Sequence, residues 1–403
     1  MKKWLLFIIV NFVLGVCYSQ NNQIRGVVKD FKTQQPIAGV SVSAGNNGAT
    51  VTNAEGGFVI FVPQETEELI FSHVSYAVWA EELNSKKSFL EVYLESEAYN
   101  LAELIFTVES GKDILENAYK NSLKKLEKSV ILHTYFREFI ESKYVDASNR
   151  MLAGNDTITT FSDGLLDYYV RNNGKSDVFV KQSRAFDNKA DSLKSADDNS
   201  SIDIRKVMVD AYEIPMVKHI LKSKDYIFEK DYKEDTNGKG MYAITIIPKE
   251  NVKEVLYEGK VLIDEPSNLI LDVYFKTSEK HHQKYAKTSR FLGFEFKNGL
   301  YESKMSYKLD ENKYLPYYKA LKHEVTYGIP IKGGKYYLSS YSSNNLVVTG
   351  YEANVKNKDR TKRYRESTLY NAGKNYTEEY WKTQNTLLLT KKEQDIIDKI
   401  MKN

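Results

Sequence analysis

The chain has 403 residues, of which 42% are hydrophobic and 28% are charged, and its formal net charge is +3. The near balance of charge excludes a polybasic or polyacidic chain, and the mean hydropathy of −0.50 excludes a membrane protein with many helices. One cysteine excludes a disulfide scaffold and a zinc site built from cysteines. The 30 Tyr and 18 Phe, set against only 7 Pro, favour β-sheet structure over disorder.

The beginning of the chain is typical of a secretory signal peptide. A positive start at Met1–Lys3 precedes an apolar run over Trp4–Val16, and Cys17 and Ser19 form a small-x-small cleavage site. We expect cleavage after Ser19, so residues 1–19 are the predicted signal peptide. The alternative is lipidation of Cys17, but Val16 stands where a lipoprotein box needs a small residue, and the sequence therefore favours cleavage.

We therefore expect the mature chain in the periplasm, or at the outer membrane and cell surface. No second run of about twenty apolar residues follows the signal peptide, so we expect no transmembrane helix after cleavage. Without its two signal-segment lysines the chain is close to neutral, which does not indicate long-range electrostatic steering of a partner.

Short β-type runs separated by turn residues fill residues 23–97. The predicted strands are Ile24–Lys29, Gly39–Ala44, Ala49–Thr52, Gly57–Val62, Glu68–Ser72, Tyr76–Glu81 and Phe89–Leu94. Seven short strands at regular spacing predict a small β-sandwich domain.

Several motifs in this region resemble the carboxypeptidase-regulatory-like domain. They are Gly26–Asp30, Pro36–Val42, Thr52–Phe58 and Leu69–Tyr76, with Asn53 and Ser75 as mild departures from the family pattern. The resemblance implies a transthyretin-like sandwich of the kind found at the N-terminus of exported Bacteroidetes-type proteins, including outer-membrane receptors.

A linker over residues 98–112 separates the sandwich from a second predicted domain, residues 113–330. Apolar spacing predicts a helix over Asp113–Lys128, and Ile204–Leu221 is predicted as helix interrupted near Pro215. A polar, Asp/Ser/Lys-rich loop is predicted over residues 187–203. The predicted strands are Leu132–Val145, Phe161–Val170, Tyr242–Pro248, Val252–Ile263, Leu269–Lys276, Ser289–Phe296, Leu300–Leu309 and Tyr318–Tyr327. Short turns between them, such as Lys297–Gly299, predict a long antiparallel sheet.

Two short motifs in the second domain carry a further resemblance. Tyr135–Glu138 is similar to a "FYRE" signature of exported Bacteroidetes proteins, and Val261–Phe275 resembles the strand–turn–strand unit of lipoprotein-carrier half-barrels. The resemblance implies a curved, half-barrel-like sheet with a helix against its concave face.

Residues 331–403 form a predicted C-terminal region that packs on the second domain. It contains a strand over Lys335–Val348 and a closing helix from Lys391. Thr390 and Glu393 form a capping box at the start of that helix. We expect Trp381 and Leu387–Leu389 to dock this tail on the sheet. The predicted fold class is therefore mainly β, a seven-stranded sandwich followed by a long curved antiparallel sheet with a few packed helices.

Catalytic and metal-binding motifs are absent from the sequence. None of the six His is followed three residues later by Glu, so the zinc pair of a metallocarboxypeptidase is missing. We interpret His281-His282 as part of a hairpin turn, Gly238–Ala243 as a second hairpin turn, and Asp197–Ser201 as an exposed loop that lacks the Gly and Glu of a calcium loop. Ser122-x-x-Lys125 matches a serine acyl-enzyme motif by letters alone. We therefore predict no catalytic residues, no metal, no cofactor and no enzyme activity.

Two features leave room for a binding role. Six bases occupy ten residues, at Lys356, Lys358, Arg360, Lys362, Arg363 and Arg365. In an exported protein they indicate lipopolysaccharide phosphates or acidic glycans rather than nucleic acid, and a solvated strand face is the simpler interpretation. Aromatic residues on predicted strands either line an apolar cavity or pack as ordinary core, namely Tyr168, Tyr169, Tyr242, Tyr257, Tyr274, Phe275, Phe291, Phe294, Phe296, Tyr301, Tyr307 and Tyr327.

Three functions are consistent with these patterns. The favoured one is a non-catalytic exported cell-envelope protein that acts as a binding or scaffold module, with an envelope protein, a glycan or a lipid as partner. The second is a periplasmic carrier of a lipid or other apolar ligand in a half-barrel cavity. Peripheral membrane association stays open for the chain as a whole. The third is a hydrolase of unrecognised type, which would need a concave pair of carboxylates.

Overall fold

A computed structural model describes the parts of the chain from which the fold is built. The described residues are 21–44, 49–73, 76–83, 88–96, 110–146, 157–188, 202–234, 240–310, 312–331, 334–377 and 387–402. The predicted cleavage site after Ser19, the Asp197–Ser201 loop, Gly238 and Trp381 lie outside them. In the described part of the chain, no helix combines the length and apolar character needed to cross a bilayer.

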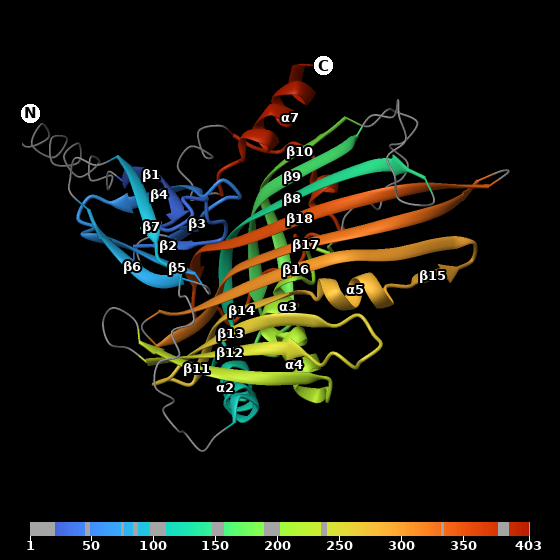
Figure 1. Cartoon of the computed structure of the whole chain (residues 1–403). Helices are drawn as coiled ribbons and strands as arrows, with labels where there is room; N and C mark the ends of the chain where they lie inside the picture. The colour runs from blue at the N-terminus through green and yellow to red at the C-terminus, as the bar shows by residue number, and fades with distance from the viewer. Residues whose placement is uncertain are drawn as a thin grey trace, which may run out of the picture.

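The first seven strands form the predicted sandwich (Figure 1). One sheet has the order β4-β1-β7, with β1 at Asn21–Asp30, β4 at Gly57–Pro63 and β7 at Phe89–Leu94; the other has the order β3-β2-β5-β6, with β2 at Ser41–Ser43, β3 at Ala49–Val51, β5 at Glu68–His73 and β6 at Tyr76–Glu82. Side chains such as Val28, Phe58 and Phe71 fill the space between the two sheets. The prediction of a seven-stranded sandwich is confirmed.

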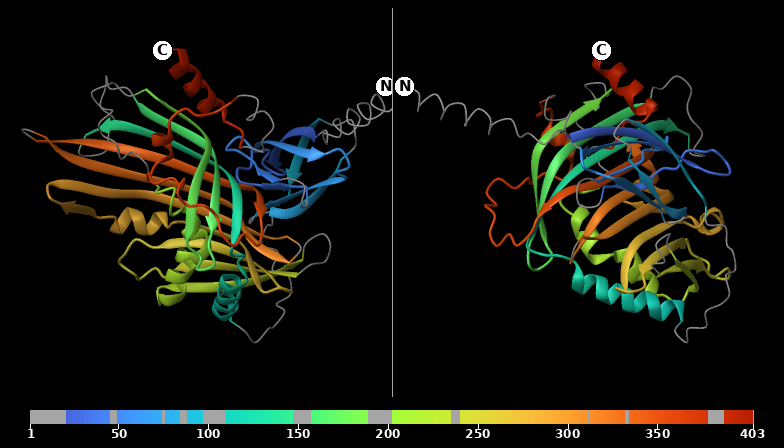
Figure 2. Two further views of the ribbon diagram at one scale, coloured as in Figure 1. Left: turned by 180° about the vertical axis from the view of Figure 1, so that it is seen from behind. Right: turned by 90° about the vertical axis from the view of Figure 1, so that its left-hand side faces the viewer.

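The second domain is built on one sheet of eleven strands. Ten of them follow the order β10-β9-β8-β18-β17-β16-β14-β13-β12-β11, and the eleventh, β15, pairs with β16. Their bounds are β8 Val130–Val145, β9 Ile158–Val170, β10 Ser176–Asp187, β11 Tyr226–Glu234, β12 Gly240–Pro248, β13 Tyr257–Asp264, β14 Leu269–Thr277, β15 Thr288–Phe291, β16 Phe294–Asp310, β17 Lys313–Ile331 and β18 Gly334–Glu352. Neighbouring strands are antiparallel, and the sheet is curved (Figure 2). The predicted long curved antiparallel sheet is confirmed.

The sheet departs from the predicted strands at several places. The turn predicted at Lys297–Gly299 is wrong, because β16 runs through it and a register shift between Asn298 and Tyr301 absorbs the irregularity. The chain reverses earlier, at Leu292 and Gly293. Strands β10 and β11 were not predicted. β18, from the C-terminal region, lies in the middle of the sheet between β8 and β17.

Helices cover one face of this sheet. α2 (Gly111–Lys125) begins at Ser110, whose hydroxyl accepts from the Asp113 amide. α3 (Val207–Glu213) and α4 (Pro215–Lys222) are separated by Ile214, whose φ of 46° ends one helix before Pro215 begins the next, as predicted. Their apolar side chains join one continuous core with the sheet, to which Leu115, Val217 and Phe275 contribute.

The chain that follows β18, which we call the C-terminal tail, covers both faces of the sheet near β10. The chain runs along the edge of β10, where the Tyr364 amide donates to the Val178 carbonyl (2.8 Å) and Asn375 forms a bridge with Ser183. A 3-10 turn, η3 (Leu369–Ala372), packs on the helix side, and α7 (Lys391–Lys402) packs on the opposite face through Ile397.

The predicted capping box at the start of α7 is confirmed. The Thr390 amide donates to the Glu393 carboxylate (2.7 Å), and the Glu393 amide donates to the Thr390 hydroxyl (3.1 Å). This reciprocal pairing satisfies two amides that the helix itself leaves without partners.

Candidate functional site

The sandwich is held against the sheet face opposite the helices. The Lys304 ammonium donates to the Gly39 carbonyl (2.7 Å), and the Tyr317 hydroxyl donates to the Thr50 carbonyl (2.7 Å). Around these bonds Val51 packs with Tyr135 and Val347 in an apolar cluster shared by the two parts. The helix-side core and the sandwich-side cluster are separate because successive residues of β8 point to opposite faces of the sheet. Phe136 enters the helix-side core, and Tyr135 faces the sandwich.

The C-terminal tail adds a third component to this junction. The Asn53 side-chain amide donates to the Leu389 carbonyl (3.2 Å), and the Glu55 carboxylate accepts from the Lys391 amide (2.9 Å). Leu387 is buried in the same cluster as Val51. The docking predicted for Leu387–Leu389 is therefore present, and the sandwich, the sheet and the tail meet at one junction.

Arg137, from the "FYRE"-like motif, lies buried at the centre of the junction with only 2% of its surface exposed. Its guanidinium donates to the carbonyls of Leu387 and Leu388, to the Tyr135 hydroxyl (2.9 Å) and to the Glu393 carboxylate (3.3 Å). Five donors in a planar fork suit such a set of acceptors. The motif therefore holds the junction together, and the contacts of Arg137 give it a structural role.

A second charged cluster lies on the same face, around Asp167 of β9. Its carboxylate faces His133 (2.8 Å), Lys181 (3.1 Å) and Lys358 (3.3 Å). Burial opposes ionisation of Asp167, but hydrogen bonds from His133 and Lys181 outweigh it and lower the pKa of Asp167 to about 2. The same hydrogen bond raises the pKa of His133.

Two bases of the predicted basic segment, Lys358 and Arg360, lie in or beside this cluster. Lys358 reaches Asp167 and lies 4.7 Å from the centre of the Phe179 ring, and Arg360 pairs with Asp177 (2.6 Å). The segment is not a strand, so the interpretation as a solvated strand face is wrong. At least two of its six bases tie the tail to β9 and β10.

The junction also encloses a small hollow of about 130 Å³, lined by charged groups that include Lys304, Lys322, Glu302 and Glu393. Burial lowers the pKa of Lys304, and burial raises the pKa of Asp272 beside it. Ligand pockets are commonly about 300 Å³ or larger, so this hollow suits ordered water better than a lipid or a sugar.

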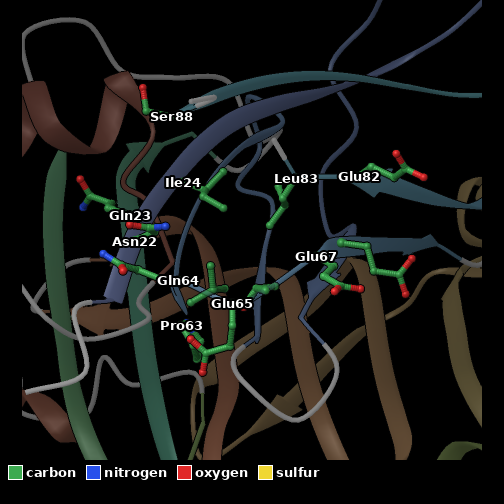
Figure 3. A pocket seen from close by; sticks show the side chains of 13 residues that line it. Asn22, Gln23, Ile24, Pro63, Gln64, Glu65, Glu67, Glu82, Leu83 and Ser88 are labelled. Carbon is green, nitrogen blue, oxygen red and sulfur yellow. The ribbon is translucent and has the colours of Figure 1, made fainter. Parts of the chain in front are cut away.

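A larger pocket of about 830 Å³ lies in the sandwich itself. Figure 3 shows Ile24 and Leu83 among the lining side chains, with Glu65 below them and the carboxylate of Glu82 directed away from Leu83. Amide side chains of Asn22, Gln23 and Gln64 complete the lining. An apolar floor with a rim of acceptors suits a partner that presents ammonium, guanidinium or hydroxyl groups.

The serine of the acyl-enzyme pattern has a structural role. Ser122 is fully buried, and its hydroxyl accepts from the Ile270 amide (2.9 Å). It therefore connects α2 to β14.

The hairpin turn predicted for His281 and His282 is wrong. Both lie in a short helix, α5 (Glu279–Tyr285). His281 contacts the Ser278 hydroxyl and the Lys249 carbonyl, and His282 contacts the Asn298 carbonyl. Among the described residues, no group of three or more His, Cys, Asp or Glu side chains is arranged to hold a metal ion.

The predicted aromatic residues do not form one group. Tyr168, Phe275 and Tyr307 belong to the core under the helices, whereas Tyr169 is buried on the other face. Phe291, Phe294 and Phe296 are exposed at the end of the sheet away from the sandwich (Figure 1). The ordinary-core interpretation therefore holds for the first set, and sequence patterns alone did not separate the two.

Comparison with known families decides the nature of the sandwich. Residues 24–106 match the family model of the CarboxypepD_reg-like domain. The predicted resemblance is confirmed for this part of the chain, and the matched domain is regulatory and non-catalytic.

Comparisons with other proteins add little to this result. The search of curated proteins finds no match. A solved structure entitled "Lipid-protein interactions in lipovitellin" is similar over 66% of this chain and 29% of the lipovitellin chain, with 10% identity and a TM-score of 0.26. That TM-score is too low to carry an argument about the fold or the ligand of this chain.

Proposed function

We propose that this protein is an exported, non-catalytic cell-envelope protein that acts as a binding or scaffold module. The observation that carries the proposal is the junction, which fastens a CarboxypepD_reg-like sandwich to the sheet and the C-terminal tail through buried bonds such as Lys304–Gly39 and Tyr317–Thr50. A module fixed in this way presents its pocket in a constant position relative to the sheet. The regulatory character of the matched family supports a role in binding rather than in catalysis.

The pocket of the sandwich is the proposed binding surface. Its carboxylate rim favours an envelope protein that presents Lys or Arg, or a glycan that presents hydroxyl groups. Nucleic acid is not a proposed partner, because carboxylates repel phosphates.

Affinity capture from a detergent-solubilised envelope fraction tests the binding role. We expect the mature chain to retain a partner that the double variant Glu67→Lys/Glu82→Lys releases. Glu116→Lys, a change at a half-buried residue of α2 far from the pocket lining, is the control and should retain the partner. Equal capture by both variants would contradict the pocket as the binding surface, and turnover of any substrate by the purified chain would contradict the non-catalytic role.

Export is tested by the mass and location of the natural protein. We expect an intact mass that begins at Gln20, in the periplasm or in the outer-membrane and surface fraction. A heavier species that begins at Cys17 would show lipidation instead. A full-length chain in the cytoplasm would contradict export.

The carrier alternative receives less support. The sheet face that would line a half-barrel cavity is covered by α2, α3 and α4, and their side chains form one continuous apolar core with it. We expect native mass spectrometry of the gently purified chain to give the bare polypeptide mass. A retained lipid-sized mass would favour the carrier.

A further inference from the structure

The hairpin between β15 and β16 exposes apolar side chains at the end of the sheet away from the sandwich (Figure 1). Phe291 is 69% exposed, Leu292 81% and Phe294 39%. Ile331, 53% exposed, lies nearby at the end of β17, because Gly293 is close to Pro330. We call these four residues the apolar tip. Exposed apolar residues that are grouped in this way mark sites of association.

The backbone conformation at the turn of the apolar tip is unfavourable for Leu292. Leu292 and Gly293 form a two-residue turn with φ of 46° and 87°. Such turns favour Asn or Gly at the first position, because other side chains are strained at positive φ. A leucine here gains no burial within the chain to offset that strain. Its side chain is therefore placed for contact with something outside the molecule.

The surroundings of the apolar tip are basic. Residues 279–297 contain five basic residues, Lys280, Lys284, Lys287, Arg290 and Lys297, and only two acidic ones, Glu279 and Glu295. Glu295 is already paired with Arg290 (3.0 Å) and Lys335 (2.9 Å). Among the described residues, Lys287 and Lys297 have no acidic partner and are exposed. The unbalanced charge beside the apolar tip is positive.

We propose that the apolar tip inserts into the surface of an anionic phospholipid bilayer, with Lys287 and Lys297 held at the lipid phosphates. Apolar side chains on a narrow hairpin enter the boundary between headgroups and acyl chains, and flanking bases add electrostatic attraction to anionic lipids. This membrane contact goes beyond the proposed function and is independent of the sandwich pocket.

Vesicle flotation of the full mature chain tests the proposal. We expect the chain to float with vesicles of phosphatidylglycerol and phosphatidylcholine and to remain unbound with phosphatidylcholine alone. Leu292→Asn should lower vesicle affinity about tenfold, the cost of removing one buried leucine side chain. The same change should leave the thermal midpoint unchanged or raise it, because Asn tolerates the turn.

Two further variants complete the test. Leu309→Asn, at an exposed leucine near the other end of β16, is the matched control and should bind like the parent chain. Lys287→Glu/Lys297→Glu should abolish binding to anionic vesicles. Undiminished flotation of the Leu292 and double-lysine variants would overturn the proposal. It would also be overturned if the parent chain formed a dimer that Leu292→Asn dissociates, because the tip would then bind a second copy.

Discussion

The guanidinium of Arg137 donates a hydrogen bond to the backbone carbonyl of Leu388, 251 positions later in the chain, at 3.0 Å. This bond connects the first long strand of the sheet to the segment that leads into the last helix. Because Arg137 is buried, its charge depends on the carbonyls, the Tyr135 hydroxyl and Glu393 for compensation.

Replacing Arg137 should therefore release the tail. We expect Arg137→Met to destabilise the fold by about 3–5 kcal/mol, since it leaves buried acceptors and Glu393 without their cation. Urea unfolding measures the loss, and limited proteolysis should cut the chain near α7 sooner. Lys392→Ala, which removes an exposed ion pair with Glu141, should cost less than about 1 kcal/mol. Similar losses in the two variants would contradict the central role of Arg137.

Lys304 and Asp272 are two buried ionisable groups that lie near each other at the junction. Lys304→Met should destabilise the fold by about 3–5 kcal/mol, because it removes the nearby cation from a buried carboxyl group and the donor from Gly39. The double variant Lys304→Met/Asp272→Asn should recover part of that loss. Additive losses in a double-mutant cycle would show that the two groups do not interact.

Two glycines at positive φ separate backbone strain from steric overlap. A Cβ at Gly56 would lie 2.4 Å from the Val28 carbonyl oxygen, whereas a Cβ at Gly174 would meet nothing within 4 Å, although their φ values of 70° and 79° are similar. We expect Gly174→Ala to cost about 1–2 kcal/mol, the strain of left-handed backbone, and Gly56→Ala to cost more. Thermal unfolding of the two variants measures this difference, and equal costs would contradict it.

The His133–Asp167 pair should give the stability two pH limits. The pKa of Asp167 is lowered, so its contribution is present above about pH 4 and is lost as the pH falls towards 2. The pKa of His133 is raised, so its contribution is complete below about pH 6.5 and is lost as the pH rises through the folded-state pKa. Urea midpoints from pH 2 to 9 test this. His133→Gln should remove the decline on the alkaline side, and an unchanged decline would contradict the assignment.

Local patterns predicted the sandwich well and the sheet less completely. Regular turns and alternation marked all seven sandwich strands, and Pro215 marked the break between two helices. Strand β10 was missed because Lys181, Gln182 and Arg184 interrupt its apolar pattern, although they have partners across the sheet or in the tail. The turn wrongly placed at Lys297–Gly299 shows the same limit, because a register shift lets an Asn-Gly pair remain within a strand.

Sequence patterns predicted that Leu387–Leu389 dock on the sheet, but they did not predict the buried charged groups of the junction. Asp163 accepts a hydrogen bond from the Tyr135 hydroxyl (2.9 Å) at this junction. Arg137, Lys304 and Asp163 look like surface residues in the sequence, and only the long-range packing of sandwich, sheet and tail buries them. The strained position of Leu292 depends likewise on where the hairpin turns, which the sequence patterns placed elsewhere.

The C-terminal tail that runs along β10 also bears on whether the protein aggregates. An open sheet edge offers unpaired amides and carbonyls that can recruit a strand from another molecule. Here the Tyr364 amide and the Asn375 backbone occupy positions along that edge. Loss of the C-terminal tail would therefore expose an edge to which a strand of another molecule could pair. By covering β10, the tail lowers the tendency of the folded protein to aggregate.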